Sequence, residues 1–491
     1  MPIATLNLVR LDRRQRDSLQ SQLCRQLRQM IISGQLPAGI RLPSTRDLVT
    51  QLGVSRNTIV YAFDQLVAEG YLQGRVGSGI YVTDLDLIKT ERTLETASNV
   101  SLKTKLRISR RAKVSSQVRI SPEYETPKIR PFRPCQPAVE HFPIRAWNRA
   151  RSYALKIGSR ELFLETEASG LPRLRRALAT YLLDARGVRC DADQIIITAG
   201  TQQALSLIGS VFIDRGDPVW IEDPGYLGAR AALLQAGARL IPIPVDEEGL
   251  TLRTSRPRKP PRLIYTTPSR QFPLGTTMTL SRRLALLEFA RANGALVIED
   301  DYDSEFRYLG RPMPSLQGLA FDDCVIYVGS FSKVMFASLR LGYVVVPQHL
   351  VEALVKAKEI HDGSAPAIDQ ATVAMFIEKG FFSIHIRRMR KLYKERRDAF
   401  LYEAKKQLSG FLTFPTIEGG MEAMGRLPSD YDDAAVSKRL GAAGIDCPPL
   451  SAYSLRAQPP GLVFGFTAFS PSQIRSAIEE SSRCLAAHCR E

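Results

Sequence analysis

The chain has 491 residues, of which 44% are hydrophobic and 24% charged, and its formal net charge is +17. This length predicts two or more globular domains, and the composition excludes a disordered or low-complexity protein. The strong positive charge favours a polyanionic partner such as nucleic acid.

The seven cysteines are dispersed without a CxxC pair, and there are only five histidines. This usage argues against a structural zinc site and for reduced thiols in the cytosol. The segment Met1–Arg16 lacks the apolar core of a signal peptide, and no long apolar run occurs. We therefore expect a cytoplasmic protein with no metal centre and no membrane contact.

Residues 18–34 have the pattern of an amphipathic helix, with apolar residues at helical spacing from Leu19 to Ile31 and Gly34 where a helix-ending glycine belongs. Ser44, followed three residues later by Asp47, is typical of a capping box that starts a second helix, ending near Leu52.

After a tight turn at Gly53-Val54, Ser55 is expected to cap a third helix whose buried face carries Val60, Phe63, Leu66 and Val67. Residues 71–82 then read as two short strands around a glycine-rich turn. Three helices and a hairpin predict a winged helix-turn-helix domain over residues 1–84.

In such a domain the first turn of the third helix enters the major groove, where arginine can bond guanine and asparagine can bond adenine. The second helix then faces the DNA backbone, and the hairpin lies by a groove. The alternative is a solvated helix end with ordinary caps. The candidate DNA contacts are Arg46, Ser55, Arg56, Asn57, Thr58, Arg75 and Gly77.

Residues 85–130 lose hydrophobic periodicity and are rich in lysine and arginine. This pattern is typical of a flexible basic linker, and contact with DNA phosphate is the less common alternative.

From residue 131 to residue 491 short apolar strands alternate with longer helical stretches, which predicts an α/β domain with a mostly parallel sheet. Ligands of such sheets bind beyond the carboxyl ends of the strands. The expected strands are Ile195–Thr198, Val219–Glu222, Leu263–Thr266, Leu296–Glu299, Val325–Val328 and Tyr343–Val346.

Lys333 lies just after one of these strands, in a run with Ser330, Ser332 and Arg340. A lysine amine can form a Schiff base with an aldehyde, while hydroxyls and a guanidinium can hold a phosphate. The run therefore suits an aldehyde cofactor that carries a phosphate.

Three other segments follow expected strands. Asp300 and Tyr302 offer an anion for a pyridine nitrogen and a donor for a ring oxygen. Tyr226 can stack on a planar ring. The turn Gly200-Thr201-Gln202 opens a helix, where phosphate is readily bound. Taken singly, each segment could be an ordinary strand–helix connection, and the acids a common helix start.

These motifs carry two resemblances. The stretches 34–48, 52–58, 68–72 and 77–79 resemble the GntR-type winged-helix family. The segments around Tyr226, Asp300 and Lys333 resemble fold-type I aminotransferases. Together the chain is similar to the MocR/GabR-type transcription regulators, over about residues 1–84 and 131–480.

The resemblance implies pyridoxal 5'-phosphate as cofactor, linked to Lys333 as an internal aldimine. It implies that Asp300 pairs with the ring nitrogen, Tyr302 with the ring hydroxyl, and that Tyr226 stacks on the ring. It also implies a homodimer that binds double-stranded DNA with paired half-sites. The residues expected to hold the phosphate are Gly200, Thr201, Gln202, Ser330, Ser332 and Arg340.

Three positions depart from the aminotransferase pattern. Val463 stands where the enzymes carry an arginine that clamps the substrate carboxylate, and an apolar side chain cannot do so. Glu165 replaces a tyrosine that reaches the partner subunit's phosphate. Arg270 occupies a place where many relatives have histidine, and it is either an alternative anion anchor or a surface or phosphate-side arginine.

We therefore expect a regulator that senses an amino compound, or the cofactor itself, through Lys333 and is not a turning-over enzyme, although residual half-transamination is compatible with the residues. An active aminotransferase with an appended DNA-binding domain is the alternative. A third hypothesis, a cofactor-free degenerate domain, is disfavoured by the retained Asp300, Tyr302, Lys333 and Arg340.

Overall fold

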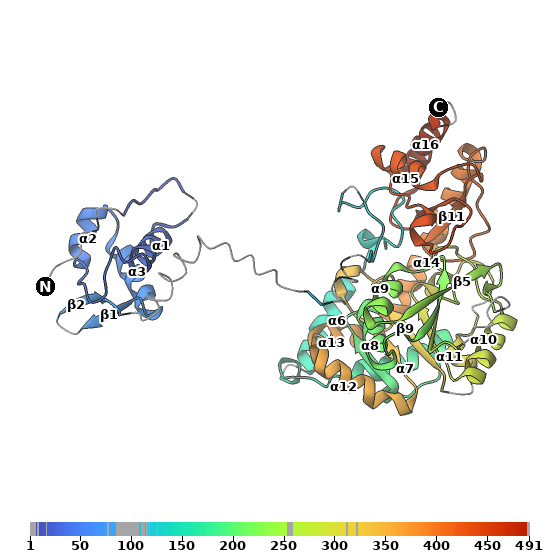
Figure 1. The fold of residues 1–491 in the computed structure, drawn as a ribbon, viewed down its shortest axis with the longest axis horizontal. Coiled ribbons are helices and arrows are strands. Elements are labelled where there is room, and N and C mark those ends of the chain that lie inside the picture. Colours follow the sequence, from blue (N-terminus) through green and yellow to red (C-terminus); the bar gives the residue numbers. More distant parts are fainter. Residues whose placement is uncertain are drawn as a thin grey trace. The chain divides into compact units, whose positions relative to one another are not determined.

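The computed structural model consists of two compact units, residues 1–107 and 108–491 (Figure 1). The boundaries expected at residues 84 and 130 stay predictions, and the stretch 85–107 lies outside the described residues. The structure describes residues 6, 9–15, 17–75, 78–84, 108–109, 113, 116, 118–124, 126–158, 160–252, 259–310, 313–320 and 323–488.

The described residues of the smaller unit form three helices and a two-stranded antiparallel hairpin, as the sequence predicts. Ser44 and Ser55 cap the second and third helices, and the capping box between Ser44 and Asp47 is present. The elements are α1 (Leu19–Ile32), α2 (Thr45–Leu52), α3 (Arg56–Ala68), β1 (Leu72–Arg75) and β2 (Gly79–Val82).

One detail of the smaller unit differs from the prediction. The buried face of α3 is made by Ile59, Ala62, Phe63 and Leu66, whereas Val67 is 40% exposed. Phe63 and Leu66 were predicted correctly, whereas Val60, which is only partly buried, and Val67 each lie one residue, about 100° of helix turn, past a buried position.

The larger unit is built on an eight-stranded sheet in the order β3-β10-β9-β8-β7-β4-β5-β6. Six strands run in one direction, and β10 and β6 run against their neighbours. The mostly parallel sheet is therefore confirmed. The strands are β3 (Ile195–Thr198), β4 (Pro218–Asp223), β5 (Arg239–Asp246), β6 (Gly249–Leu250), β7 (Leu263–Thr266), β8 (Leu296–Asp301), β9 (Val325–Ser330) and β10 (Gly342–Val345).

Helices cover both faces of this sheet, because neighbouring strand residues point to opposite sides. Ile195 and Ile197 pack with α6, α7, α13 and α14, whereas Ile196 packs with α8, α9 and α12. The helices around the sheet are α6 (Ile144–Ile157), α7 (Pro172–Arg186), α8 (Thr201–Phe212), α9 (Leu227–Ala236), α10 (Leu280–Asn293), α11 (Leu316–Leu319), α12 (Val351–Asp362), α13 (Ala367–Glu378) and α14 (Phe381–Gln407).

The C-terminal part of the larger unit forms a lobe of its own at one end of the sheet domain (Figure 1). Its core joins the end of α14 to an antiparallel strand pair and two helices, with Phe132 and Phe400 among its buried rings. The added elements are β11 (Glu422–Arg426), β12 (Gly461–Gly465), α15 (Asp433–Ala442) and α16 (Pro471–His488).

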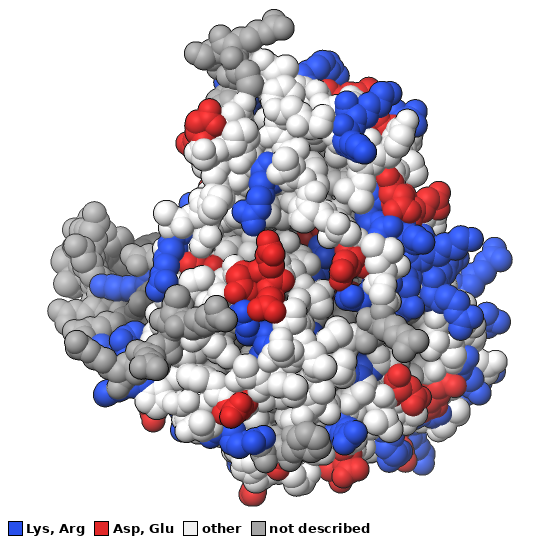
Figure 2. Space-filling view, turned by 90° about the vertical axis from the view of Figure 1, so that its right-hand side faces the viewer, with Lys and Arg blue, Asp and Glu red and all other residues white. Residues whose placement is uncertain are grey.

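The positive charge is unevenly distributed. On the face drawn in Figure 2, lysine and arginine side chains gather along one side. The solvent side of α14 exposes five cations within about two turns: Arg387, Arg388, Arg390, Lys391 and Lys394. Among the described residues, no helix is both long and apolar enough to cross a lipid bilayer.

Candidate functional site

Lys333 lies in the turn after β9, at the carboxyl edge of the parallel strands. Its Nζ donates a hydrogen bond of 3.0 Å to the backbone carbonyl of Cys135, and the side chain is partly buried. The amine is therefore held where the sheet domain meets the segment that precedes α6.

The register of β10 explains why the loops predicted to hold phosphate lie together. Gly342 pairs with Thr198 of β3 on one side and with Ser330 of β9 on the other. A Cβ on Gly342 would lie 2.9 Å from the Cα of Gly200. The close approach of the two loops therefore requires glycine at residue 342.

The donors at this place suit a phosphate dianion. Gly200 precedes α8 with φ of 97°, and no side chain caps that helix end. The backbone N–H of Ser332 donates to Ser330 Oγ at 3.1 Å, which folds the serine turn tightly. Arg340 is exposed and has a left-handed backbone, with φ of 51°. A helix N-terminus, two hydroxyls and a guanidinium form a typical phosphate site.

Asp300 on β8 offers an acceptor that the protein leaves unused. The side chain is 3% exposed, and its Oδ2 accepts a 2.7 Å hydrogen bond from the Tyr265 hydroxyl. Its Oδ1 is buried and has no hydrogen-bond partner among the described residues. Burial raises the pKa of Asp300 to about 7, while the hydrogen bond from Tyr265 opposes the rise. A cationic donor such as a protonated pyridine nitrogen would satisfy this oxygen.

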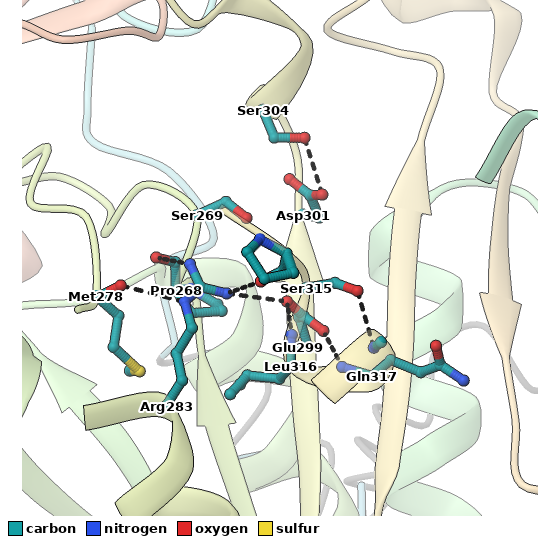
Figure 3. Close-up of polar contacts among 12 residues, drawn as sticks. Pro268, Ser269, Met278, Arg283, Glu299, Asp301, Ser304, Ser315, Leu316 and Gln317 are labelled. Carbon is teal, nitrogen blue, oxygen red and sulfur yellow. Dashed lines mark hydrogen bonds and ion pairs between the residues drawn. The ribbon is translucent and has the colours of Figure 1, made fainter. Parts of the chain in front are cut away.

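The two neighbouring acids of β8, Glu299 and Asp301, already bind other groups of the protein (Figure 3). Glu299 is fully buried, accepts the N–H groups of Leu316 and Gln317 at the start of α11, and lies 3.8 Å from Arg283. Asp301 accepts from Arg186 at 2.8 Å, and from Tyr327 and Ser304.

Strand alternation sends both of these side chains to the face opposite Asp300. Glu299 and Asp301 each lie within 4 Å of an arginine, whereas no ion pair of Asp300 is found among the residues that the structure describes. Asp300 is therefore the acid of this run that is available to a ligand.

Aromatic rings line the same region. Tyr226 precedes α9, and its ring meets Phe272 edge to face at 6.2 Å. Tyr302 meets the same phenylalanine at 6.0 Å, and its hydroxyl lies 3.5 Å from Glu422 Oε1. Gly228 has no room for a Cβ, because the Tyr226 hydroxyl and Gln202 Oε1 occupy that space.

The residues present thus fit pyridoxal phosphate in their donors and acceptors. In the described part of the chain, Asp300 has a buried oxygen without a hydrogen-bond partner and the start of α8 has no side-chain cap, while Lys333 supplies an amine. The individual roles assigned from the sequence to the lysine, the aspartate, the tyrosines and the phosphate-binding residues stay predictions.

The residues predicted to contact DNA lie on the surface of the smaller unit. Arg46, Arg56 and Asn57 are exposed at the starts of α2 and α3. Ser55 Oγ accepts from the Thr58 N–H at 3.2 Å and lies 2.9 Å from the Thr58 hydroxyl, so the Ser55 side chain also caps α3.

The hairpin is only partly described. Arg75 is exposed at the end of β1, with its guanidinium 4.7 Å from the centre of the Tyr81 ring. Gly77 lies outside the described residues. The contacts of all seven candidates with DNA remain predictions.

Comparison with known proteins places both units in families. Residues 19–82 match the family of bacterial regulatory proteins, gntR family, and residues 135–479 match aminotransferase class I and II. A probable rhizopine catabolism regulatory protein, MocR, from Rhizobium meliloti is 38% identical over 95% of this chain and 94% of its own length.

The chain belongs to the MocR-type family of transcriptional regulators.

A second MocR-type relative is the pyridoxine biosynthesis transcriptional regulator PdxR of Corynebacterium glutamicum, 32% identical over 95% of both chains. Among solved structures, α-aminoadipate aminotransferase from Thermus thermophilus aligns with a TM-score of 0.71 and 29% identity, over 79% of this chain and 99% of its own. The predicted combination of a GntR-type DNA-binding domain with an aminotransferase-like domain of the pyridoxal-phosphate-dependent class is thus confirmed.

The departures noted in the sequence can now be placed on this MocR-type fold. Val463 on β12 is fully buried and packs with Phe272 and Tyr453, beside Tyr226 and Tyr302. Glu165 is exposed after a short 3-10 turn. Val463, which is predicted to stand in place of the arginine that binds the substrate carboxylate, therefore lies against the aromatic rings of the candidate site.

Arg270 is buried, at 7% exposure, so the surface alternative for this residue is wrong. Its Nε lies 3.6 Å from Asp303 Oδ2, and its guanidinium donates to the backbone carbonyl of Glu422. Gly275 and Gly420 leave room for it, since a Cβ on either would press on the arginine side chain.

Sequence reasoning missed several residues of the site. Cys135 and Glu422 border Lys333 and Tyr302, and Tyr265 holds Asp300. Tyr265 could have been found, because it lies in a predicted strand next to that of Asp300. Cys135 and Glu422 stand in no recognisable motif, and they join the site only through the contact between the C-terminal lobe and the sheet.

Proposed function

We propose that this MocR-type regulator binds pyridoxal phosphate at Lys333 and uses it to sense an amine that alters its DNA binding. The observation that carries the proposal is the buried, unpartnered Oδ1 of Asp300 beside Lys333 and the uncapped start of α8. The aminotransferase neighbour was solved with a phosphopyridoxyl adduct of leucine, which supports this cofactor.

When bound, pyridoxal phosphate supplies an aldehyde that reacts reversibly with primary amines. Lys333 would hold the cofactor, Asp300 would keep its ring nitrogen protonated, and Tyr302 would donate to the ring oxygen. Tyr226 would cover the ring. Gly200, Thr201, Gln202, Ser330, Ser332 and Arg340 would hold the phosphate.

An effector changes DNA binding only if it binds the two arrangements of the regulator with different affinity. An amine that displaces Lys333 would break its hydrogen bond to the Cys135 carbonyl and so alter the contact between the sheet and the segment that precedes α6. We expect a homodimer, in which two DNA-binding domains meet paired half-sites of an operator. The cofactor itself is the second candidate signal.

An active aminotransferase is the alternative function, and the 29% identical aminotransferase structure favours it. Val463 argues against it, because the buried apolar side chain cannot bind a substrate carboxylate. Residual half-transamination without turnover is compatible with the sensor.

The test is a titration of the purified, cofactor-loaded protein with primary amines. We expect the absorption of the lysine-linked cofactor, near ~420 nm, to change with the amine and to be absent in Lys333→Ala. Product that accumulates over many turnovers would contradict the sensor and support the enzyme.

A further inference from the structure

The region beside Lys333 contains a buried acidic side chain, Glu422, which interacts electrostatically with the lysine. Glu422 on β11 is 1% exposed, and its Oε1 lies 3.5 Å from both the Cys135 thiol and the Tyr302 hydroxyl. Its Oε2 is buried and, among the described residues, has no hydrogen-bond partner. An unpaired buried carboxylate oxygen is costly unless a ligand completes it.

The same region has an apolar wall. Val463 lies on β12, the strand that pairs with β11, and is fully buried against Phe272 and Tyr453. This wall can accept the methylene groups of a ligand but not its charge.

Arg270 does not neutralise the negative charges of both acids in this region, Asp303 and Glu422. Its guanidinium is held by Asp303 and by the Glu422 backbone carbonyl. Asp303 is also buried, at 1% exposure. One arginine therefore faces two buried carboxylates, Asp303 and Glu422. Lys333, the other cation that interacts with Glu422, is the residue assigned to the cofactor.

We infer that the effector is a primary amine with a second hydrogen-bond-donating group, an ammonium or a hydroxyl, that Glu422 receives, and that it carries no carboxylate. This inference rests on the proposed sensing function and narrows its ligand class. Burial raises the pKa of Glu422, and the nearby charges of Arg270 and Lys333 oppose the rise.

The test uses full-length, cofactor-loaded protein and four probes with the same four-carbon chain: 1,4-diaminobutane, 4-aminobutan-1-ol, butylamine and 4-aminobutanoate. The dissociation constant of each is read from the change in cofactor absorption. We expect the diamine or the amino alcohol to bind at least about tenfold tighter than both 4-aminobutanoate and butylamine, as a charge-assisted bond implies. The same comparison is then made with sets of probes that have two-carbon and three-carbon chains.

Glu422→Gln removes the negative charge at nearly constant shape and is expected to abolish the preference for the diamine over butylamine. Glu418→Gln is the matched control, because Glu418 is half exposed and pairs with Arg307 at 2.8 Å, and we expect it to keep the preference. The wild-type panel decides the question even where Glu422→Gln fails to fold.

Tighter binding of 4-aminobutanoate than of the donor-bearing amines would overturn this inference and leave the sensor intact. An unchanged preference in a folded Glu422→Gln variant would also overturn it. Failure of every amine to alter the cofactor absorption would overturn the sensor itself.

Discussion

Replacing Asp300 with asparagine should stabilise the cofactor-free protein above neutral pH and weaken cofactor binding. The pKa of Asp300 is raised by burial from 3.8 to about 7. Below about pH 4 the carboxyl is neutral in both folded and unfolded chains, and its folding cost is absent. As the pH rises from about 4 to about 7, the unfolded chain releases its proton while the folded protein retains it, so stability falls across this window and the loss is complete above pH 7.

The size of the effect follows from the shift. A difference of about 3 pKa units, at about 1.4 kcal/mol per unit, gives an upper limit of about 4 kcal/mol at pH 8. The introduced amide would keep an acceptor for Tyr265 and avoid the buried charge, so Asp300→Asn should raise the free energy of unfolding toward this limit. The cofactor loses a charge-assisted bond and should bind about 10- to 150-fold more weakly.

Urea unfolding of the cofactor-free protein at pH 5 and pH 8, with a pyridoxal phosphate titration of each variant, measures both effects. Asp301→Asn is the control. That residue pairs with Arg186 at 2.8 Å, so its loss should destabilise the protein at both pH values. The reasoning is refuted if Asp300→Asn lowers stability at pH 8 and leaves cofactor affinity unchanged.

Three further predictions concern the phosphate site and the DNA-binding unit. Gly200→Ala places a methyl group where the protein leaves open space, and it should weaken the binding of pyridoxal phosphate. Gly216→Ala is the control, because Gly216 has a similar φ of 92° and similar open space, and it should leave the dissociation constant unchanged. Equal effects of the two substitutions on the dissociation constant would contradict the assignment of Gly200 to the phosphate site. Ser55→Ala should lower the stability of the smaller unit by about 1 kcal/mol through the lost cap, and thermal unfolding measures it. Arg56→Ala should leave stability unchanged and weaken operator binding about tenfold or more in a gel-shift titration; unaltered operator affinity would remove Arg56 from the interface.

Local signals in the sequence predicted much of this structure. The caps Ser44 and Ser55 and six sheet strands follow from residue types at fixed spacing. Strands β5 and β11 were missed because β5 contains Pro242 and Pro244, and β11 reads Glu-Ala-Met-Gly-Arg, which lacks a run of β-branched residues.

The site was only partly predictable, because sequence patterns report local structure and not contacts between distant segments. Asp300 and Lys333 follow predicted strands, so a parallel sheet brings them to one edge. Glu422 reaches the same place from the C-terminal lobe, and its contact with Cys135 joins residues 287 positions apart. No local pattern encodes such a contact, and the ligand preference that we infer depends on it.

The central claim is that the cofactor site controls DNA binding. Its most direct test is the operator affinity of the cofactor-loaded protein with and without 1,4-diaminobutane, compared with that of the Lys333→Ala variant. The account predicts a change of about fivefold or more in the wild type, and none in the variant. Equal operator affinity of the wild type and of Lys333→Ala, each with and without the diamine, would contradict the central claim, provided that the cofactor and the diamine are shown to be bound in the wild type.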